Sequence, residues 1–389
     1  MSNVRRKVAT LIAGAGCALV ATVAAAQTPA TQTPATQTPA TQPPGGQPAG
    51  DYNVSARSDA DKALANPYAR NETFFKIPKT LTLGSVSGID VDKDHRSIWV
   101  TQRCGGQDYC IGSDADPIWK FDAGGNVVKH FGSGMVVYPH GLHVDRQGNV
   151  WIVDVRTNTH QQGNQSAKVI PGAKPNGAQV LKFSPDGKLL LTLGVPGVYG
   201  TDETHLSQPS AVITAPNGDI FVADGHDSAP SNNRIVKYDK TGKFIKAWGG
   251  SGTGPEQLDC PHALAMDSQG RLFVADRGNN RIQIYDQDGK LLDSWKQFGR
   301  PSGMFIENDI LYVADSQSSV RQKNAYIRGV HVGSARTGVV TAFIPDPLGN
   351  PTPWFPLRGT TGAEGIVAVD GAIYVSQVTP PGLAKYTLK

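Results

Sequence analysis

The chain has 389 residues, a formal net charge of +4 and 44 glycines. Beyond the N-terminal segment no block of like charge occurs, which argues against a nucleic acid or an anionic membrane as partner. The many glycines and the lack of helical periodicity favour an all-β protein.

The first residues have the features of a secretory signal. A basic stretch, Arg5 to Lys7, precedes the apolar run Val8–Val23 and the small-residue motif Ala24–Ala26. We expect residues 1–26 to be removed and the protein to be exported, to the periplasm or the extracellular space. The run is too short and too weakly apolar for a transmembrane span. Cys17 lies in a poor lipobox, so no lipid anchor is expected.

Residues 27–50 contain three QTPAT repeats with further Pro, Gly and Gln. They offer almost no apolar side chains to bury, which predicts a disordered tether. Residues 51–78 are interpreted as an N-terminal extension, and residues 79–389 as one folded domain.

One pattern recurs six times in that domain: a small residue, an apolar strand, a tight turn and a second strand with an aromatic residue. Most copies continue into two further strands, as in Ile235–Gly249, so each unit has four antiparallel strands. Tandem four-stranded units predict a six-bladed β-propeller with blades of the NHL type. The copies begin near Ser85, Tyr138, Gln208, Cys260, Arg300 and Gly362.

The last copy is one strand short, because the chain stops at Lys389. Lys79–Gly84 resembles Leu189–Gly194, the outer strand of another unit. We therefore expect Lys79–Gly84 to complete the last blade, so that an N-terminal strand closes the ring and leaves no open edge.

Three cysteines remain after the signal. In an oxidising compartment, Cys104 and Cys110 are close enough in sequence to form a disulfide that closes one short loop. Cys260 is then expected to be a buried small apolar residue.

One position alternates in character around the predicted ring. It precedes the small residue that opens each innermost strand, so its six side chains should surround the mouth of the central channel. Two imidazoles and a carboxylate on alternate blades predict a divalent metal site at His140, His262 and Glu364. Zinc is the first expectation, and non-haem iron also suits this set. In order, the six residues are Ser87, His140, Ser210, His262, Ser302 and Glu364.

Another position recurs at the ends of second strands, where four blades carry aspartate. This recurrence predicts a structural role in turns, with Asp154 and Asp276 also able to orient the neighbouring ligands. The four residues are Asp154, Asp224, Asp276 and Asp315. The longest insertions follow second strands or precede first strands, so one face is expected to be rich in loops and to carry the function.

The motifs around these positions resemble the lyase domain of peptidylglycine α-amidating enzymes. They are YPHGL at Tyr138–Leu142, PHAL at Pro261–Leu264 and VADRGNNRIQ at Val274–Gln283. The resemblance implies a six-bladed propeller that cleaves a peptidyl-α-hydroxyglycine to a peptide amide and glyoxylate at a zinc ion. It places two ligand histidines on His140 and His262, the third on Glu364, and two site arginines on Arg103 and Arg277.

The chain departs from that family at three places. The catalytic tyrosine of the family falls on His226, for which two interpretations stay open: a base near neutral pH, or a surface histidine on a loop. A methionine before the third ligand falls on Gly362. An acidic residue linked to a structural calcium falls on Gly365, so the calcium that the resemblance implies lacks this residue here.

Two hypotheses follow. The first is an exported metal-dependent lyase, expected as a monomer, acting on a small-molecule or peptide substrate with a carboxylate. The alternative is a non-catalytic NHL propeller that binds a protein or peptide at its loop-rich face. A lactonase-like calcium propeller would need more carboxylates at the axis than Glu364 alone.

Overall fold

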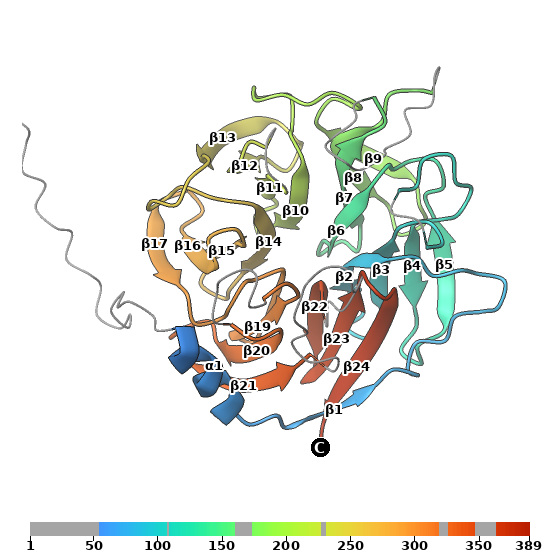
Figure 1. Cartoon of the computed structure of the whole chain (residues 1–389). Coiled ribbons are helices and arrows are strands. Elements are labelled where there is room, and N and C mark those ends of the chain that lie inside the picture. Colours follow the sequence, from blue (N-terminus) through green and yellow to red (C-terminus); the bar gives the residue numbers. More distant parts are fainter. Residues whose placement is uncertain (1–53, 107–108, 160–172, 227–230, 319–325, 347–362) are drawn as a thin grey trace, which may run out of the picture. The chain divides into compact units, whose positions relative to one another are not determined.

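The computed structural model describes residues 54–106, 109–159, 173–226, 231–318, 326–346 and 363–389. These residues form six four-stranded antiparallel sheets, arranged radially around a common axis (Figure 1). The prediction of an all-β, six-bladed propeller is confirmed. The expected signal peptide and tether lie outside the described residues.

The strands of each blade are given from the innermost to the outermost. Blade one consists of β2 (Val86–Val91), β3 (Ile98–Gln102), β4 (Ile118–Phe121) and β5 (Val127–Phe131). Blade two consists of β6 (Pro139–Val144), β7 (Val150–Thr157), β8 (Gly177–Phe183) and β9 (Leu189–Leu193). Blade three consists of β10 (Pro209–Thr214), β11 (Ile220–Asp224), β12 (Arg234–Tyr238) and β13 (Phe244–Gly249).

Blade four consists of β14 (Pro261–Met266), β15 (Leu272–Asp276), β16 (Arg281–Tyr285) and β17 (Leu291–Trp295). Blade five consists of β18 (Gly303–Glu307), β19 (Ile310–Asp315), β20 (Gly329–Ser334) and β21 (Val340–Pro345). Blade six consists of β22 (Gly365–Val369), β23 (Ala372–Gln377), β24 (Gly382–Leu388) and β1 (Tyr68–Asn71).

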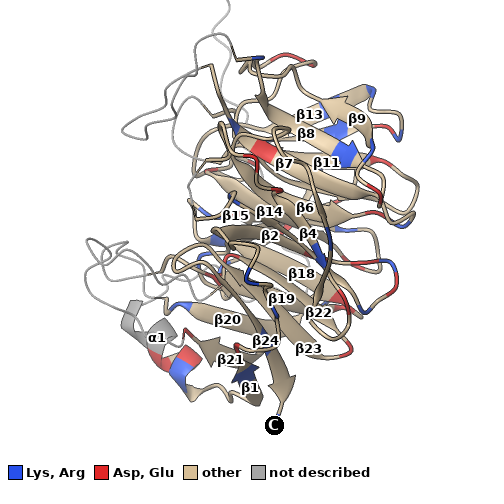
Figure 2. Ribbon diagram, turned by 90° about the vertical axis from the view of Figure 1, so that its right-hand side faces the viewer, with Lys and Arg blue, Asp and Glu red and all other residues tan. Residues whose placement is uncertain are grey.

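The turns between strands follow from the repeated Asp-x-x-Gly pattern. Between β6 and β7, the Asp145 carboxylate accepts hydrogen bonds from the backbone of Gln147 and Asn149, at 3.0 and 2.8 Å. Gly148 has a φ of 86°, a left-handed conformation that favours glycine. Charged residues gather mainly at such turns and loops (Figure 2).

The core lies between neighbouring blades. Side chains from the facing sheets of each adjacent pair form an apolar cluster, including the clusters between blades five and six and between blades six and one. Each innermost strand also contacts the next one around the ring, and β22 contacts β2. Because the packing is circular, the strands that line the channel are fixed on both sides.

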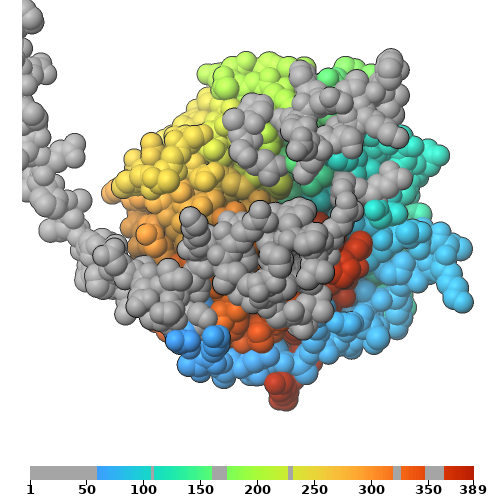
Figure 3. Space-filling model, in the orientation of Figure 1, coloured from blue at the N-terminus to red at the C-terminus, as the bar shows by residue number. Residues whose placement is uncertain are grey.

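The ring is closed by an N-terminal strand, as the sequence predicts, but the strand is a different one. β1 (Tyr68–Asn71) pairs with β24, with Tyr68 opposite Leu388 and Asn71 opposite Lys385. Figure 3 shows the earliest described segments beside the last ones. The assignment of Lys79–Gly84 is wrong: these residues form no strand and run toward β2 instead. The closing strand thus lies inside the segment interpreted as an extension.

Helix α1 (Val54–Ala63) precedes β1. Its Asp61 is fully buried and lies 3.2 Å from His331 Nε2 of blade five. Among the described residues no helix combines the length and hydropathy needed to cross a membrane.

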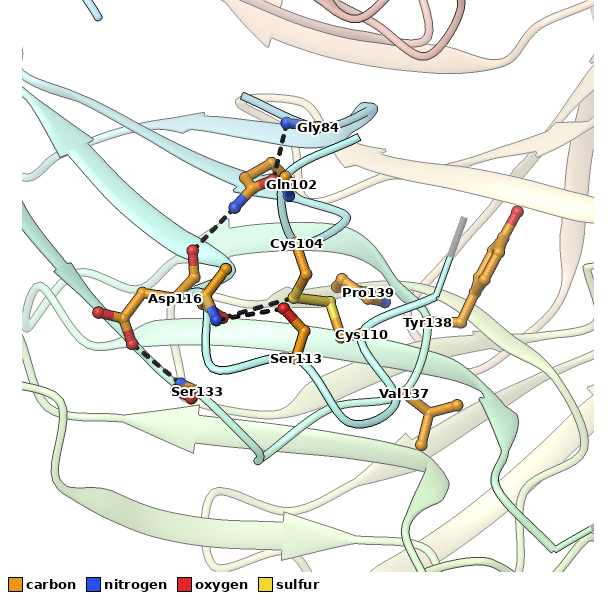
Figure 4. Close-up of a disulfide and its surroundings, with 12 residues drawn as sticks. Gly84, Gln102, Cys104, Cys110, Ser113, Asp116, Ser133, Val137, Tyr138 and Pro139 are labelled. Atoms are coloured by element: carbon orange, nitrogen blue, oxygen red, sulfur yellow. Dashed lines mark hydrogen bonds between the residues drawn. A yellow bond between two sulfur atoms is a disulfide. The ribbon is translucent and has the colours of Figure 1, made fainter. Parts of the chain in front are cut away.

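The disulfide predicted between Cys104 and Cys110 is present. It closes a short loop after β3 and is drawn in Figure 4. The Cys110 amide donates a hydrogen bond to the carbonyl of Val137 before β6. Cys260 is buried, as expected.

Candidate functional site

The six residues predicted at the mouth of the channel occupy equivalent positions: each is the second residue of the innermost strand in blades one to four and directly precedes that strand in blades five and six. In blades one to four the pairing register shifts at this position, which indicates a β-bulge. A bulge re-aims the side chain of the extra residue. The sequence pattern did not reveal this feature. In blade two the residue after the bulge must be glycine, because a Cβ on Gly141 would lie 2.5 Å from the Ser210 carbonyl oxygen.

His140 and His262 are both buried, with 3% and 2% of their surfaces exposed. His140 Nδ1 lies 2.9 Å from the carbonyl oxygen of Ser210, and His262 Nδ1 lies 2.7 Å from that of Ser302. Because a carbonyl oxygen can only accept, each Nδ1 carries the proton in these bonds. The Nε2 lone pair of each histidine therefore points toward the axis.

The serines on the odd blades thus orient the ligand-type residues on the even blades. Besides these carbonyl contacts, the Ser87 hydroxyl donates to the carbonyl of Pro139, and the Ser210 hydroxyl donates to that of Pro261. Sequence reasoning placed the serines in the ring but missed this role. Their strict alternation with His140 and His262 was the available signal.

His226, which follows β11 of blade three, joins the two histidines. Its Nε2 lies 3.1 Å from His140 Nε2, and ligand atoms of His140, His226 and His262 all lie within 4.8 Å of one another. The sequence left His226 as either a separate base or a surface histidine; the structure buries it and brings it into the same cluster.

Glu364 lies at the same place, as predicted. Its Oε1 is 3.3 Å from His262 Nε2 and 3.9 Å from His140 Nε2. Its Oε2 accepts a hydrogen bond of 2.7 Å from the hydroxyl of Ser316. Three imidazoles and one carboxylate, all more than nine-tenths buried, therefore meet at the end of the channel.

Burial holds the pKa of His140 well below its usual range, and the neighbouring His226 and Arg103 lower this pKa further. The pKa of His262 is likewise held well below its usual range by burial and then by Arg277. Both rings are therefore neutral at neutral pH, the form that can donate a lone pair to a metal.

The arrangement fits a divalent cation. His262 Nε2 is buried and has no hydrogen-bond partner among the described residues, a costly state that a bound cation would relieve. In a tetrahedral zinc site with bonds of about 2.1 Å, neighbouring ligand atoms lie about 3.4 Å apart. Three of the separations above, 3.1, 3.3 and 3.9 Å, are near this value.

The two predicted arginines both lie near the cluster, in different surroundings. Arg277 is paired with Glu364, with Nη1 3.6 Å from Oε1, and it donates to Cys260 Sγ at 3.2 Å. Arg103 is buried, with 4% of its surface exposed, and the central carbon of its guanidinium lies 3.9 Å from the ring centroid of Tyr138. Among the described residues no carboxylate pairs with it. Arg103 is therefore the one of the two that is available to an anionic ligand.

The recurring aspartates have the structural role that the pattern predicts. Each accepts a backbone hydrogen bond from the segment that leads into the innermost strand of its own blade. Asp154, for example, accepts from Val137 at 2.8 Å and from Tyr138 at 2.6 Å. Burial raises the pKa of Asp154 to about 7. The other three bonds are Ser207 to Asp224, Asp259 to Asp276 and Arg300 to Asp315.

A cavity of about 670 Å³ lies along the innermost strands and reaches the cluster. His140, His262 and Glu364 contribute to its wall, together with apolar side chains of the innermost strands and with polar and charged residues such as Asp90, His143 and Glu307. The volume lies within the range of small-molecule sites in proteins.

Comparison with known proteins gives the NHL repeat family at residues 258–285. A probable peptidyl-alpha-hydroxyglycine alpha-amidating lyase of Caenorhabditis elegans is 29% identical over 266 residues, covering 67% of each chain. The peptidyl-glycine alpha-amidating monooxygenase of Mus musculus is 36% identical over 159 residues, which cover 39% of this chain and 14% of the mouse protein. The resemblance noted in the motifs is thus confirmed over most of the propeller.

Among solved structures, a gluconolactonase from Xanthomonas campestris superposes with a TM-score of 0.51 at 15% identity. It covers 79% of this chain, and 87% of its own chain is matched. This similarity shows the propeller fold alone.

Proposed function

We propose that this chain, an NHL-repeat propeller related in sequence to the amidating lyases, is a metal-dependent lyase that cleaves carbinolamides to an amide and glyoxylate. The observation that carries the proposal is the convergence of His140, His226, His262 and Glu364 at the end of the channel, beside Arg103. A resemblance in fold alone would not require these buried polar groups to meet.

In this proposal His140 and His262 hold a divalent metal, zinc first, through their Nε2 atoms. His226 and Glu364 are the other two candidate ligands. One of them does not bind the metal, so that the substrate can take the remaining coordination position. When bound, such an ion would polarise the carbinol hydroxyl of the substrate. The buried Glu364 also offsets the positive charge of Arg277 at the centre.

Arg103 binds the carboxylate next to the carbinol carbon. A guanidinium can hold a carboxylate through two parallel hydrogen bonds, which fixes the orientation of the substrate as well as its charge. Arg277, already paired with Glu364, positions that carboxylate within the cluster and contributes less to substrate binding.

The reaction needs a group that accepts the hydroxyl proton while the carbon–nitrogen bond breaks, and the amide nitrogen gains a proton. No other atom is gained or lost. His226 and Glu364 are the two groups at the centre that can accept this proton. The tyrosine that serves the related family is replaced by His226, so the substrate range is expected to differ from that of a peptide-amidating enzyme.

We further propose that the protein is exported and acts as a monomer outside the cytoplasm, on a small molecule or peptide with a carboxylate. The signal-like N-terminus and the Cys104–Cys110 disulfide support export.

The test is glyoxylate release from an N-acyl-α-hydroxyglycine by the purified protein, with and without a chelator, together with elemental analysis. Chelator-sensitive release supports the proposal. Metal-replete protein that gives only the uncatalysed rate would contradict it and favour the alternative of a propeller that binds a protein or peptide at its loop-rich face.

A further inference from the structure

Tyr138 packs against both the histidine cluster and Arg103, the arginine that is available to an anion. It is two residues before His140, and 7% of its surface is exposed. Its amide donates to Asp154 and its carbonyl accepts from the amide of Val155, at 2.6 and 3.1 Å. Its ring centroid is 6.5 Å from that of His226. The backbone of Tyr138 is therefore fixed, and its ring occupies a defined place beside the cluster.

The Arg103 guanidinium stacks on this ring, with its central carbon 3.9 Å from the ring centroid. A second guanidinium, that of Arg156, lies 4.9 Å from the same centroid. Arg103 Nε is buried and has no hydrogen-bond partner among the described residues. A buried cation is costly, and an aromatic face stabilises it through the negative potential of its π-electrons.

An aromatic ring holds an arginine in a way that a carboxylate cannot. A carboxylate would occupy the N–H donors of the guanidinium, as Asp276 does for Arg281 with a bond of 2.6 Å. A ring instead contacts the flat face and leaves the donors at the edge available. The stacking thus orients Arg103 while preserving its capacity to bind a carboxylate in two-pronged fashion.

The disulfide loop supports the same arrangement. Arg103 immediately precedes Cys104, and Tyr109, just before Cys110, packs against Tyr138 with ring centroids 5.1 Å apart. The Tyr109 hydroxyl accepts a hydrogen bond of 3.2 Å from Arg156. The Cys110 amide also donates a hydrogen bond to the carbonyl of Val137, the residue before Tyr138.

From these contacts we infer that Tyr138 is a positioning residue for carboxylate binding: its ring holds the Arg103 guanidinium so that the N–H donors face the anionic substrate. The inference rests on the proposed function, since it names the residue that gives Arg103 its role there. Nothing in the family resemblance assigns a function to this side chain.

The experiment measures glycolate binding by calorimetry and the kinetics of glyoxylate release, with metal content and melting temperature as controls. Glycolate carries a carboxylate next to a carbinol carbon and needs no turnover. Tyr138→Phe keeps the ring and should bind glycolate within about threefold of wild type, because Phe and Tyr faces attract cations similarly. Tyr138→Leu should weaken glycolate binding and raise KM by about tenfold, with kcat and metal content changed much less.

Tyr374→Leu is the matched control. Tyr374 is also 7% exposed and lies under a cation, with Lys385 Nζ 5.2 Å from its ring centroid, but it belongs to the cluster between blades six and one. It should change stability without changing glycolate affinity. If Tyr138→Leu does not fold, Tyr138→Met preserves more of the side-chain length and carries the same expectation.

The outcomes separate the two proposals. If Tyr138→Leu binds glycolate as wild type does while Arg103→Met does not, the positioning role is overturned. In the Arg103→Met background no stacking remains, so Tyr138→Leu should have no further effect there. If it lowers the affinity for glycolate by the same factor as in wild type, the positioning role is also overturned. If glycolate binding depends on Tyr138 but the wild-type protein releases no glyoxylate, the proposed reaction is contradicted. The carboxylate-binding role of Arg103 and Tyr138 is then still supported.

Discussion

The Nε2 atoms of His140 and His226 lie 3.1 Å apart, although 86 residues separate them in the sequence. His140 uses its Nδ1 proton for the Ser210 carbonyl, so its Nε2 can only accept a proton or donate a lone pair to a metal. Without a metal, His226 must donate to it; with a metal, both Nε2 atoms can face the ion. This pair therefore links the role of His226 to metal occupancy.

The first prediction concerns His226 as a ligand. His226→Ala should lower metal affinity by more than about 100-fold, because even groups that only support ligands change affinity by about 10- to 100-fold. Metal content after dialysis against a graded chelator is the measurement. His130→Ala, which removes a largely exposed histidine paired with Asp116, is the control. Unchanged metal content in His226→Ala would remove it from the ligand set and leave it the role of base.

The second prediction concerns the pH dependence of metal retention. The pKa values of His140 and His262 are held well below their usual range by burial, so protons compete weakly for their Nε2 atoms. Metal should therefore remain bound at about pH 5.5, where ordinary histidines are mostly protonated. Equilibrium dialysis across this range checks it. Release with a midpoint near the ordinary histidine pKa would mean that these two residues do not control binding.

The third prediction separates the two arginines. Arg103→Lys keeps the charge but loses the planar fork, so KM for the carbinolamide should rise by about tenfold. Arg277→Lys should instead lower kcat or metal content, because Arg277 contacts Glu364. Steady-state glyoxylate release by both variants is the measurement. If Arg277→Lys raises KM while Arg103→Lys lowers kcat or metal content, Arg277 is the residue that binds the substrate carboxylate.

The fourth prediction concerns closure of the ring. A chain that begins at Glu72 lacks β1 but keeps Lys79–Gly84, and it should expose the edge of β24. We expect its melting temperature to fall by roughly 5 °C or more and its tendency to aggregate to rise. A chain that begins at Asn66 is the control, since it lacks α1 as well but keeps β1. Equal melting of the two chains would show that β1 is dispensable.

The fifth prediction concerns Asp154, whose pKa burial raises to about 7 from an ordinary value of 3.8. Between these two pH values the folded protein keeps a proton that the unfolded chain has lost. The contribution of this residue to stability is thus fully present below about pH 3.8 and is lost as the pH rises through about 7. The melting temperature of wild type relative to Asp154→Asn should fall between about pH 5 and pH 8. A constant difference would show that Asp154 does not titrate in this window.

Much of the propeller could be predicted because each blade repeats one local pattern. The alternation of apolar residues, the Asp-x-x-Gly turns and the recurring aspartates act within a single blade, so they are visible in sequence. The closing strand was misassigned because a sheet edge accepts any extended segment of suitable length. Lys79–Gly84 resembled an outer strand, but Tyr68–Asn71 pairs with β24.

For the site, the sequence by itself determined which side chains reach the mouth of the channel, because position within the blade fixes where a residue lies on the ring. His140, His262 and Glu364 follow from that rule, whereas Arg103 and Arg277 came from the resemblance of the motifs to the amidating lyases. Only the tertiary structure decided how neighbouring blades combine these groups. In the structure His226 lies against His140, Arg277 pairs with Glu364, and the guanidinium of Arg103 stacks on the ring of Tyr138. These contacts join different blades or loops, and their distances depend on bulges and on packing around the whole ring, which no local pattern specifies.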